Sequence, residues 1–175
     1  TNVIGMSMRA FEACPRVAEI IVVARPSDHD VIRETAQQCG ITKFHAIVAG
    51  GSTRQESVMC GLRALSKGTT MIAVHDGARP LVKPEHIAQV IRDASVFGGA
   101  TLGVPVKDTI KVVNDHLIVD TPYRPHLFIT QTPQVFKRQL YFEAVTFAEE
   151  HALDFTDDCQ LIEAINCKVY MTEGD

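Results

Sequence analysis

Apolar residues in this chain form short continuous runs separated by segments with helical periodicity. The runs at residues 19–24, 44–49, 71–75 and 100–104 predict buried strands, because a strand covered on both faces shows no alternation. Between the runs, apolar residues recur three and four positions apart, as in helices that bury one face. This alternation of strand and helix predicts an α/β fold with a mostly parallel central sheet, flanked by helices and built with right-handed crossovers.

Further elements follow from local signals. Residues 3–13 are expected to be the end of a helix, and Thr53 with Glu56 is a capping-box pattern at the start of another. The remaining elements are expected in this order: a helix from Pro84 to Gly98, a strand at 127–130 that ends before 131–134, a helix around 140–148, a helix starting at 156–158, and a strand at 167–172.

The alternation of strand and helix stops at residues 109–113 and 116–120, which are predicted to form two short strands around Asn114 and Asp115. Such a pair is a hairpin signal. A hairpin has too little core to stand alone, so we expect this arm, about 108–126, to pack on a second subunit. The alternative is that it covers an edge of its own sheet.

The composition and net charge of the chain argue against several classes of protein. The chain has 17 basic and 21 acidic residues, a net charge of −4, which argues against nucleic acid as a partner. The longest apolar runs are too short to cross a membrane. Five scattered cysteines without C-x-x-C spacing indicate reduced thiols in a cytoplasmic protein. A length of 175 residues fits a single domain, residues 1–175, and both ends look truncated, because patterned segments begin and end abruptly.

Candidate chemistry begins at the loop after residues 71–75. Asp76, Gly77 and Arg79 follow that strand directly, and ligands of α/β sheets bind at the carboxyl ends of strands. Asp76 could hold a ribose hydroxyl or a metal bound to phosphates, while Gly77 lets the backbone approach the ligand. The alternative is that Asp76 caps the turn and pairs with Arg79. A hydrolase triad involving Ser57 and His75 is rejected, since no G-x-S-x-G elbow is present.

Two glycines, Gly50 and Gly51, separate another strand from a helix start, where backbone N–H groups can face an anion or a base. The spacing matches neither a P-loop nor a dinucleotide fingerprint. Small polar residues and cations recur at successive strand ends, which suits a nucleotide beside a second phosphate. These residues are Gly51, Ser52, Ser57, Asp76, Gly77, Arg79, Lys107, Asp108, Thr109, Arg124, Thr132 and Thr156.

Five ordered motifs resemble one known family. They are Gly50-Gly51-x-x-Arg54-Gln55-x-Ser57-Val58, His75-Asp76-Gly77-Ala78-Arg79-Pro80, Pro105-Val106-x-Asp108-Thr109-Ile110-Lys111, Gln131-Thr132-Pro133-Gln134 and Thr156-Asp157-Asp158. On these motifs the chain is similar to the 2-C-methyl-D-erythritol 4-phosphate cytidylyltransferases, the IspD family of the non-mevalonate isoprenoid pathway.

The resemblance implies a Rossmann-like nucleotidyltransferase, a homodimer joined through the arm, and transfer of a cytidylyl group from CTP to the sugar phosphate with Mg²⁺ as cofactor. By matching position, it implies that Gly51, Ser52 and Ser57 bind the cytosine, and that Asp76 and Gly77 hold the ribose and the region of the metal. It also implies that Thr109, Arg124 and Thr156 bind the acceptor phosphate, with Arg124 as the catalytic residue. A plant member would lie in the plastid.

The chain departs from the family pattern in several places. The glycine-rich loop with its Arg and Lys, and a C-terminal segment with a substrate lysine, are absent, so we expect the natural protein to be longer at both ends and this chain to lack most activity. Gly77 stands where alanine is more usual, and Tyr123 where many members have an acidic residue. Two alternatives stay open: a ribitol 5-phosphate cytidylyltransferase, and a non-catalytic nucleotide-binding module.

Overall fold

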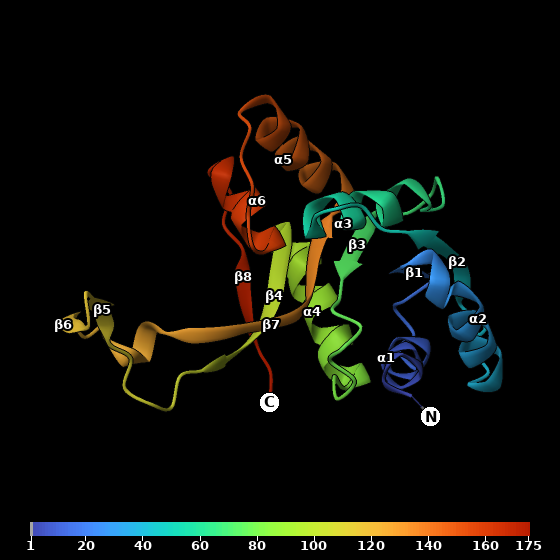
Figure 1. Cartoon of the computed structure of the whole chain (residues 1–175), viewed down its shortest axis with the longest axis horizontal. Helices are drawn as coiled ribbons and strands as arrows, with labels where there is room; N and C mark the ends of the chain where they lie inside the picture. Colours follow the sequence, from blue (N-terminus) through green and yellow to red (C-terminus); the bar gives the residue numbers. More distant parts are fainter. Residues whose placement is uncertain (1) are drawn as a thin grey trace.

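The computed structural model describes residues 2–175, and the strands of this part of the chain form three hydrogen-bonded sheets (Figure 1). The elements are, in chain order, α1 (Val3–Glu12), β1 (Ile20–Ala24), η1 (Pro26–Asp28), α2 (His29–Gln38), β2 (Phe44–Ala49), α3 (Arg54–Arg63), β3 (Met71–Val74), α4 (Pro84–Phe97), β4 (Gly99–Pro105), β5 (Val112–Asn114), β6 (Leu117–Asp120), η2 (Arg124–His126), β7 (Phe128–Lys137), α5 (Arg138–Glu150), α6 (Asp158–Ala164) and β8 (Tyr170–Glu173).

The directions of the strands agree with the α/β prediction, but one strand, β3, has a different neighbour from the one expected. β1 and β2 pair in parallel, and a second sheet has the order β3-β7-β4-β8. β8 is parallel to β4, while β7 runs antiparallel to both β3 and β4, so β3, β4 and β8 share one direction. The mostly parallel sheet is therefore confirmed. β3, expected to be a central parallel strand, instead has β7 as its ladder partner in the described chain and lies at the edge of its sheet.

The strand expected at 127–130 is longer than predicted. β7 continues to Lys137 through the Gln131-Thr132-Pro133-Gln134 segment, so the predicted strand end at this segment is wrong. Proline cannot donate to a ladder and is normally confined to edges or irregular positions. Here the pairing of β4 with β7 shifts register between Thr101 and Gly103, opposite this segment, and Pro133 is fully buried. The irregularity lets β7 pass through the middle of the sheet.

Helices cover both faces of the larger sheet. Adjacent residues of a strand point to opposite faces, and Val135 and Phe136 of β7 accordingly belong to different core clusters. Phe136 packs with α3, α5 and α6, whereas Val135 packs with α4. α1 and α2 pack against the β1–β2 pair. The expected helices and final strand are all present, and the arrangement places the carboxyl ends of β2 and β3 close to the start of α3.

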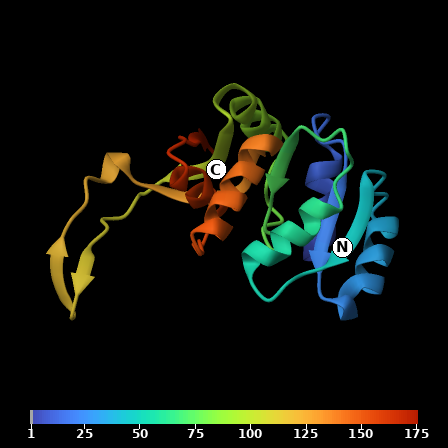
Figure 2. The same ribbon diagram turned by 90° about the horizontal axis from the view of Figure 1, so that it is seen from above.

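The predicted hairpin is formed by β5 and β6, but its turn lies one residue later than expected. Asn114 pairs with Leu117, so Asp115 and His116 occupy the turn, with φ of 46° and 63°. A two-residue turn of type I′ has positive φ at both central residues, as Asp115 and His116 do here. The arm extends away from the rest of the chain (Figures 1 and 2). The alternative that it lies over its own sheet is wrong, because β5 and β6 pair with each other alone within residues 2–175.

Candidate active site

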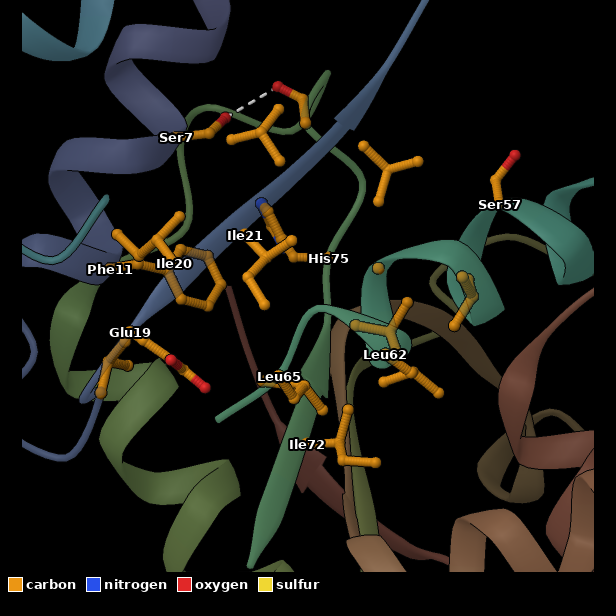
Figure 3. A pocket seen from close by; sticks show the side chains of 18 of the residues that line it. Ser7, Phe11, Glu19, Ile20, Ile21, Ser57, Leu62, Leu65, Ile72 and His75 are labelled. Atoms are coloured by element: carbon orange, nitrogen blue, oxygen red, sulfur yellow. Dashed lines mark hydrogen bonds between the residues drawn. The ribbon is translucent and has the colours of Figure 1, made fainter. Parts of the chain in front are cut away.

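A cavity of about 800 Å³ lies between β1 and β3. Its walls are mainly apolar, and Figure 3 shows Ile21, Leu62 and Ile72 among them. Polar groups line it where β2 and β3 end: Gly51, Arg54, Ser57 and Asp76. We call these four residues the mouth of the cavity. The structure thus brings the residues predicted after two different strands to one opening.

The loop between β2 and α3 is held in place by its own hydrogen bonds. Thr53 accepts from the N–H of Glu56, and Glu56 Oε2 accepts from the backbone N–H groups of Ser52, at 2.7 Å, and Thr53, at 3.3 Å, so the predicted capping box is confirmed. Hydrogen bonds from the Ser52 hydroxyl and the backbone lower the pKa of Glu56. A Cβ on Gly51 would lie 2.4 Å from Cβ of Glu56, so only glycine fits there. The loop is therefore preorganised.

Ser57 stands at the inner end of this loop. Its hydroxyl donates to the carbonyl of Thr53 at 2.9 Å and accepts from the N–H of Gly51 at 3.1 Å. It makes no hydrogen bond to His75 in residues 2–175. The rejection of a Ser–His–Asp triad is thus consistent with the geometry, since the serine proton is directed to the backbone.

Asp76 follows β3 and faces the mouth while pairing with Arg79. Its Oδ2 lies 3.1 Å from Nε of Arg79, and its backbone N–H donates to the hydroxyl of Thr132 at 3.2 Å. These contacts agree with the alternative interpretation, in which Asp76 caps the turn and pairs with Arg79. The carboxylate nevertheless stays 41% exposed, and Oδ1 accepts no hydrogen bond in the described chain. Oδ1 of Asp76 has only a long, 3.9 Å contact with a terminal nitrogen of Arg54, so this oxygen can still bind a ligand at the mouth.

Gly77, the next residue, is anchored by α1. The hydroxyl of Ser7 donates to the carbonyl of Gly77 at 2.8 Å, as the dashed line in Figure 3 shows. A Cβ added at Gly77 would lie 2.9 Å from the terminal methyl of Ile4. That methyl is the movable end of a flexible side chain, so an alanine at this position would require only a small adjustment of Ile4.

His75 is a half-buried residue with a structural role. Its Nδ1 lies 2.9 Å from the hydroxyl of Thr132 and its Nε2 lies 3.1 Å from the carbonyl of Arg79. Burial lowers the pKa of His75, although the carbonyl of Arg79 acts in the opposite direction. Thr132 therefore joins His75 to the backbone of Asp76, and it fixes the loop from the neighbouring strand β7.

Sequence reasoning missed an ion pair behind the mouth. The guanidinium of Arg54 lies 2.7 Å from Oδ2 of Asp158, whose side chain is only 2% exposed. Asp157 was expected to start α6 and does so, because its side chain accepts from the N–H of Gln160 at 2.9 Å. Asp158 has a different partner. The sequence places Arg54 and Asp158 each in a family motif, which marks both residues as candidates. It does not give the distance between them, so it could not predict the ion pair.

The predicted acceptor-binding residues lie in two separate places. Thr156 is exposed just before α6, where its hydroxyl and N–H both donate to Oε1 of Gln160. Thr109 and Arg124 are exposed at the base of the arm, and Arg124 donates to the carbonyl of Lys107 at 3.0 Å. No hydrogen bond or ion pair in residues 2–175 joins Thr109 or Arg124 to the mouth. One chain therefore does not bring the three together.

Residues 2–175 contain no group of three or more His, Cys, Asp or Glu side chains arranged to hold a metal ion. Asp76 nevertheless fits Mg²⁺, which is often bound through one carboxylate and the phosphates of a substrate. In the described part of the chain, no helix combines the length and apolar character needed to cross a bilayer.

Comparison with known proteins gives a consistent result. The family model described as IspD, 2-C-methyl-D-erythritol 4-phosphate cytidylyltransferase, matches residues 1–175. A cytidylyltransferase of that description from Pelotomaculum thermopropionicum is 40% identical over 98% of this chain and 73% of its own length. One from Caldanaerobacter subterraneus is 41% identical over 99% and 77%.

Solved structures agree with the sequence matches. The crystal structure of a 4-diphosphocytidyl-2C-methyl-D-erythritol synthase from Anaerococcus prevotii aligns with a TM-score of 0.91 at 28% identity, covering 100% of this chain and 78% of that one. A 2-C-methyl-D-erythritol 4-phosphate cytidylyltransferase from Thermus thermophilus aligns with a TM-score of 0.82 at 30% identity, covering 99% and 79%.

The site combines a preorganised Gly50-Gly51 loop with the carboxylate of Asp76 at one end of the strands of an α/β fold. The family model and the structural matches place the chain in the class of nucleotidyltransferases. The chain belongs to the IspD family of 2-C-methyl-D-erythritol 4-phosphate cytidylyltransferases.

Proposed function

We propose that this protein transfers a cytidylyl group from CTP to 2-C-methyl-D-erythritol 4-phosphate. A phosphate oxygen of the acceptor forms a bond to the α-phosphorus of CTP, the bond to the β-phosphate breaks, and pyrophosphate leaves. The observation that carries this proposal is the family match across all 175 residues. The mouth supports it, because backbone and hydroxyl groups at the start of α3 lie beside a half-exposed carboxylate.

We assign the nucleotide to the mouth. Gly51, Ser52 and Ser57 bind the cytosine through a loop that Glu56 already holds rigid. Asp76 and Gly77 bind the ribose and the region of the metal. When bound, Mg²⁺ neutralises phosphate charge and orients the triphosphate. Because phosphoryl transfer depends mainly on positioning and charge neutralisation, preorganised groups of this kind are what the reaction requires.

We further propose that the acceptor site is shared between two copies of the chain. The arm exposes a cluster of apolar side chains: Val112, Val113, Leu117, Ile118 and Val119. A two-stranded hairpin with an exposed apolar surface indicates a partner. In a dimer, Thr109 and Arg124 from one arm would join Thr156 of the other copy on the acceptor phosphate, with Arg124 orienting the nucleophile. The five free thiols fit a reducing compartment, so we place the enzyme in the cytoplasm.

The test is pyrophosphate release by the full-length protein. CTP is compared with ATP, GTP and UTP, and 2-C-methyl-D-erythritol 4-phosphate with ribitol 5-phosphate. We expect turnover with CTP and the methylerythritol acceptor. Turnover only with ribitol 5-phosphate would replace the acceptor in this proposal. CTP binding without any turnover would instead identify a nucleotide-binding module.

A further inference from the structure

The Arg54–Asp158 pair connects the first residues of two helices that are far apart in the sequence. Arg54 begins α3 and Asp158 begins α6, and their charged groups are 2.7 Å apart. Asp158 is 2% exposed, whereas Arg54 is 38% exposed. A carboxylate this deeply buried requires a partner, because an unpaired buried charge is strongly destabilising. The guanidinium thus holds α3 at a fixed distance from α6.

Asp158 is itself fixed from two further elements. The hydroxyl of Tyr141, on α5, donates to Oδ1 at 2.6 Å, and the backbone N–H of Asp158 donates to Oε1 of Gln134, on β7, at 3.0 Å. Tyr141 and Gln134 are both buried. Asp158 is therefore a rigid anchor, and the position of Arg54 follows from it.

The same guanidinium also faces Asp76. Its second terminal nitrogen lies 3.9 Å from Oδ1 of Asp76. Burial opposes the charge on Arg54, but Asp158 and, more weakly, Asp76 raise the pKa of Arg54 above its ordinary value. One side chain therefore contacts the anchor of α6 and the carboxylate of the mouth, while its backbone belongs to the helix that carries Ser57.

We propose that Arg54 is a positioning residue that sets the distance between the nucleotide-binding loop, Asp76 and the acceptor-binding residue Thr156. This inference rests on the proposed function, which puts the nucleotide at the mouth and the acceptor phosphate at Thr156. Thr156 lies two residues before Asp158, so a displaced Asp158 displaces Thr156 as well. Transfer requires both reactants in line, and small misplacements reduce the rate strongly. A planar fork that spans two carboxylates is a property of arginine that lysine lacks.

The experiment compares Arg54→Lys and Arg54→Gln with the unchanged full-length enzyme. The matched control is Arg63→Gln, an exposed arginine at the other end of α3 that forms no ion pair within residues 2–175. KM is measured for CTP and for the acceptor, together with kcat and thermal unfolding. We expect both KM values to rise about tenfold or more and kcat to fall in both Arg54 variants, with Arg63→Gln unchanged.

A double variant separates positioning from folding. Arg54→Gln leaves Asp158 buried without a cation, whereas Arg54→Gln with Asp158→Asn removes both charges and leaves amides that can pair. We expect the double variant to recover thermal stability while both KM values stay raised. Recovery of KM together with stability would assign Arg54 a purely structural role and overturn the inference. A rise in only one KM would overturn it too, whereas an unchanged enzyme that fails to turn over would reject the proposed function instead.

Discussion

The phenol of Tyr141 donates a 2.6 Å hydrogen bond to Oδ1 of Asp158, and both side chains are buried. Burial, followed by the neighbouring carboxylate, raises the pKa of Tyr141, so the phenol keeps its proton and remains a donor. This bond joins the first turn of α5 to the start of α6. The wall behind the mouth is thus held together by a buried polar network rather than by apolar packing alone.

Replacing Tyr141 by phenylalanine removes this donor and retains the ring. We expect Tyr141→Phe to lose about 1–3 kcal/mol of stability, because the carboxylate loses a partner that water cannot replace. Urea unfolding measures the change. Tyr170→Phe is the control, since Tyr170 is exposed and its hydroxyl makes no hydrogen bond in the described chain. Equal losses in the two variants would show that the bond contributes nothing.

Asp76→Asn removes the charge that the mouth offers to a metal-bound nucleotide. We expect the affinity for Mg-CTP to fall about tenfold or more, since interactions with charged groups are worth more than neutral ones. Calorimetric titration of Mg-CTP tests this. Asp30→Asn, on α2, is the matched control. An unchanged titration of Asp76→Asn would place the nucleotide elsewhere.

Arg124→Ala tests the role of the arm in binding the acceptor. We expect the KM for the sugar phosphate to rise or kcat to fall by about tenfold or more, with CTP affinity nearly unchanged, because no hydrogen bond or ion pair joins Arg124 to the mouth within residues 2–175. Steady-state kinetics with each substrate varied separately gives the answer, and Arg92→Ala on α4 is the control. Loss of CTP affinity would contradict the assignment.

The arm can be tested independently of catalysis. Ile118 is 64% exposed on β6, and we expect Ile118→Asp to shift a dimer to monomers, because a charge placed in an apolar interface is not compensated. Light scattering after gel filtration, at several concentrations, measures the mass. Val96→Asp makes the same change on an exposed position of α4. A wild-type chain that is monomeric throughout would exclude the shared acceptor site.

His75 predicts how stability depends on pH. Burial lowers its pKa in the folded chain, so the unfolded chain binds the proton first as the pH falls through about 6.5. Stability is therefore retained above that pH and lost progressively below it. We expect His75→Asn to flatten the curve of unfolding free energy between about pH 7.5 and 5.5. His116→Asn, at an exposed turn of the arm, is the control, and parallel curves for wild type and His75→Asn would contradict the prediction.

Local signals in the sequence determined most of the elements. Continuous apolar runs identified β1 to β4. Of these four strands, β4 alone is buried along most of its length, so the predicted burial on both faces holds for β4 and not for β2 and β3. Thr53 and Glu56 identified the start of α3, since a capping box involves only residues three apart. The family motifs then located the mouth residues, whose type and order along the chain are properties of the sequence.

Tertiary structure alone decided which of these elements meet. The path of β7 through the sheet depends on an irregular pairing opposite Pro133. The strand propensity of a single segment carries no information about which strands will lie beside it, so the sequence did not predict this path. The pairing of Arg54 with Asp158 joins residues about a hundred positions apart, so no local pattern contains it. Sequence fixes which groups a chain carries and how each segment folds locally, whereas distances between groups from different segments arise only when those segments pack.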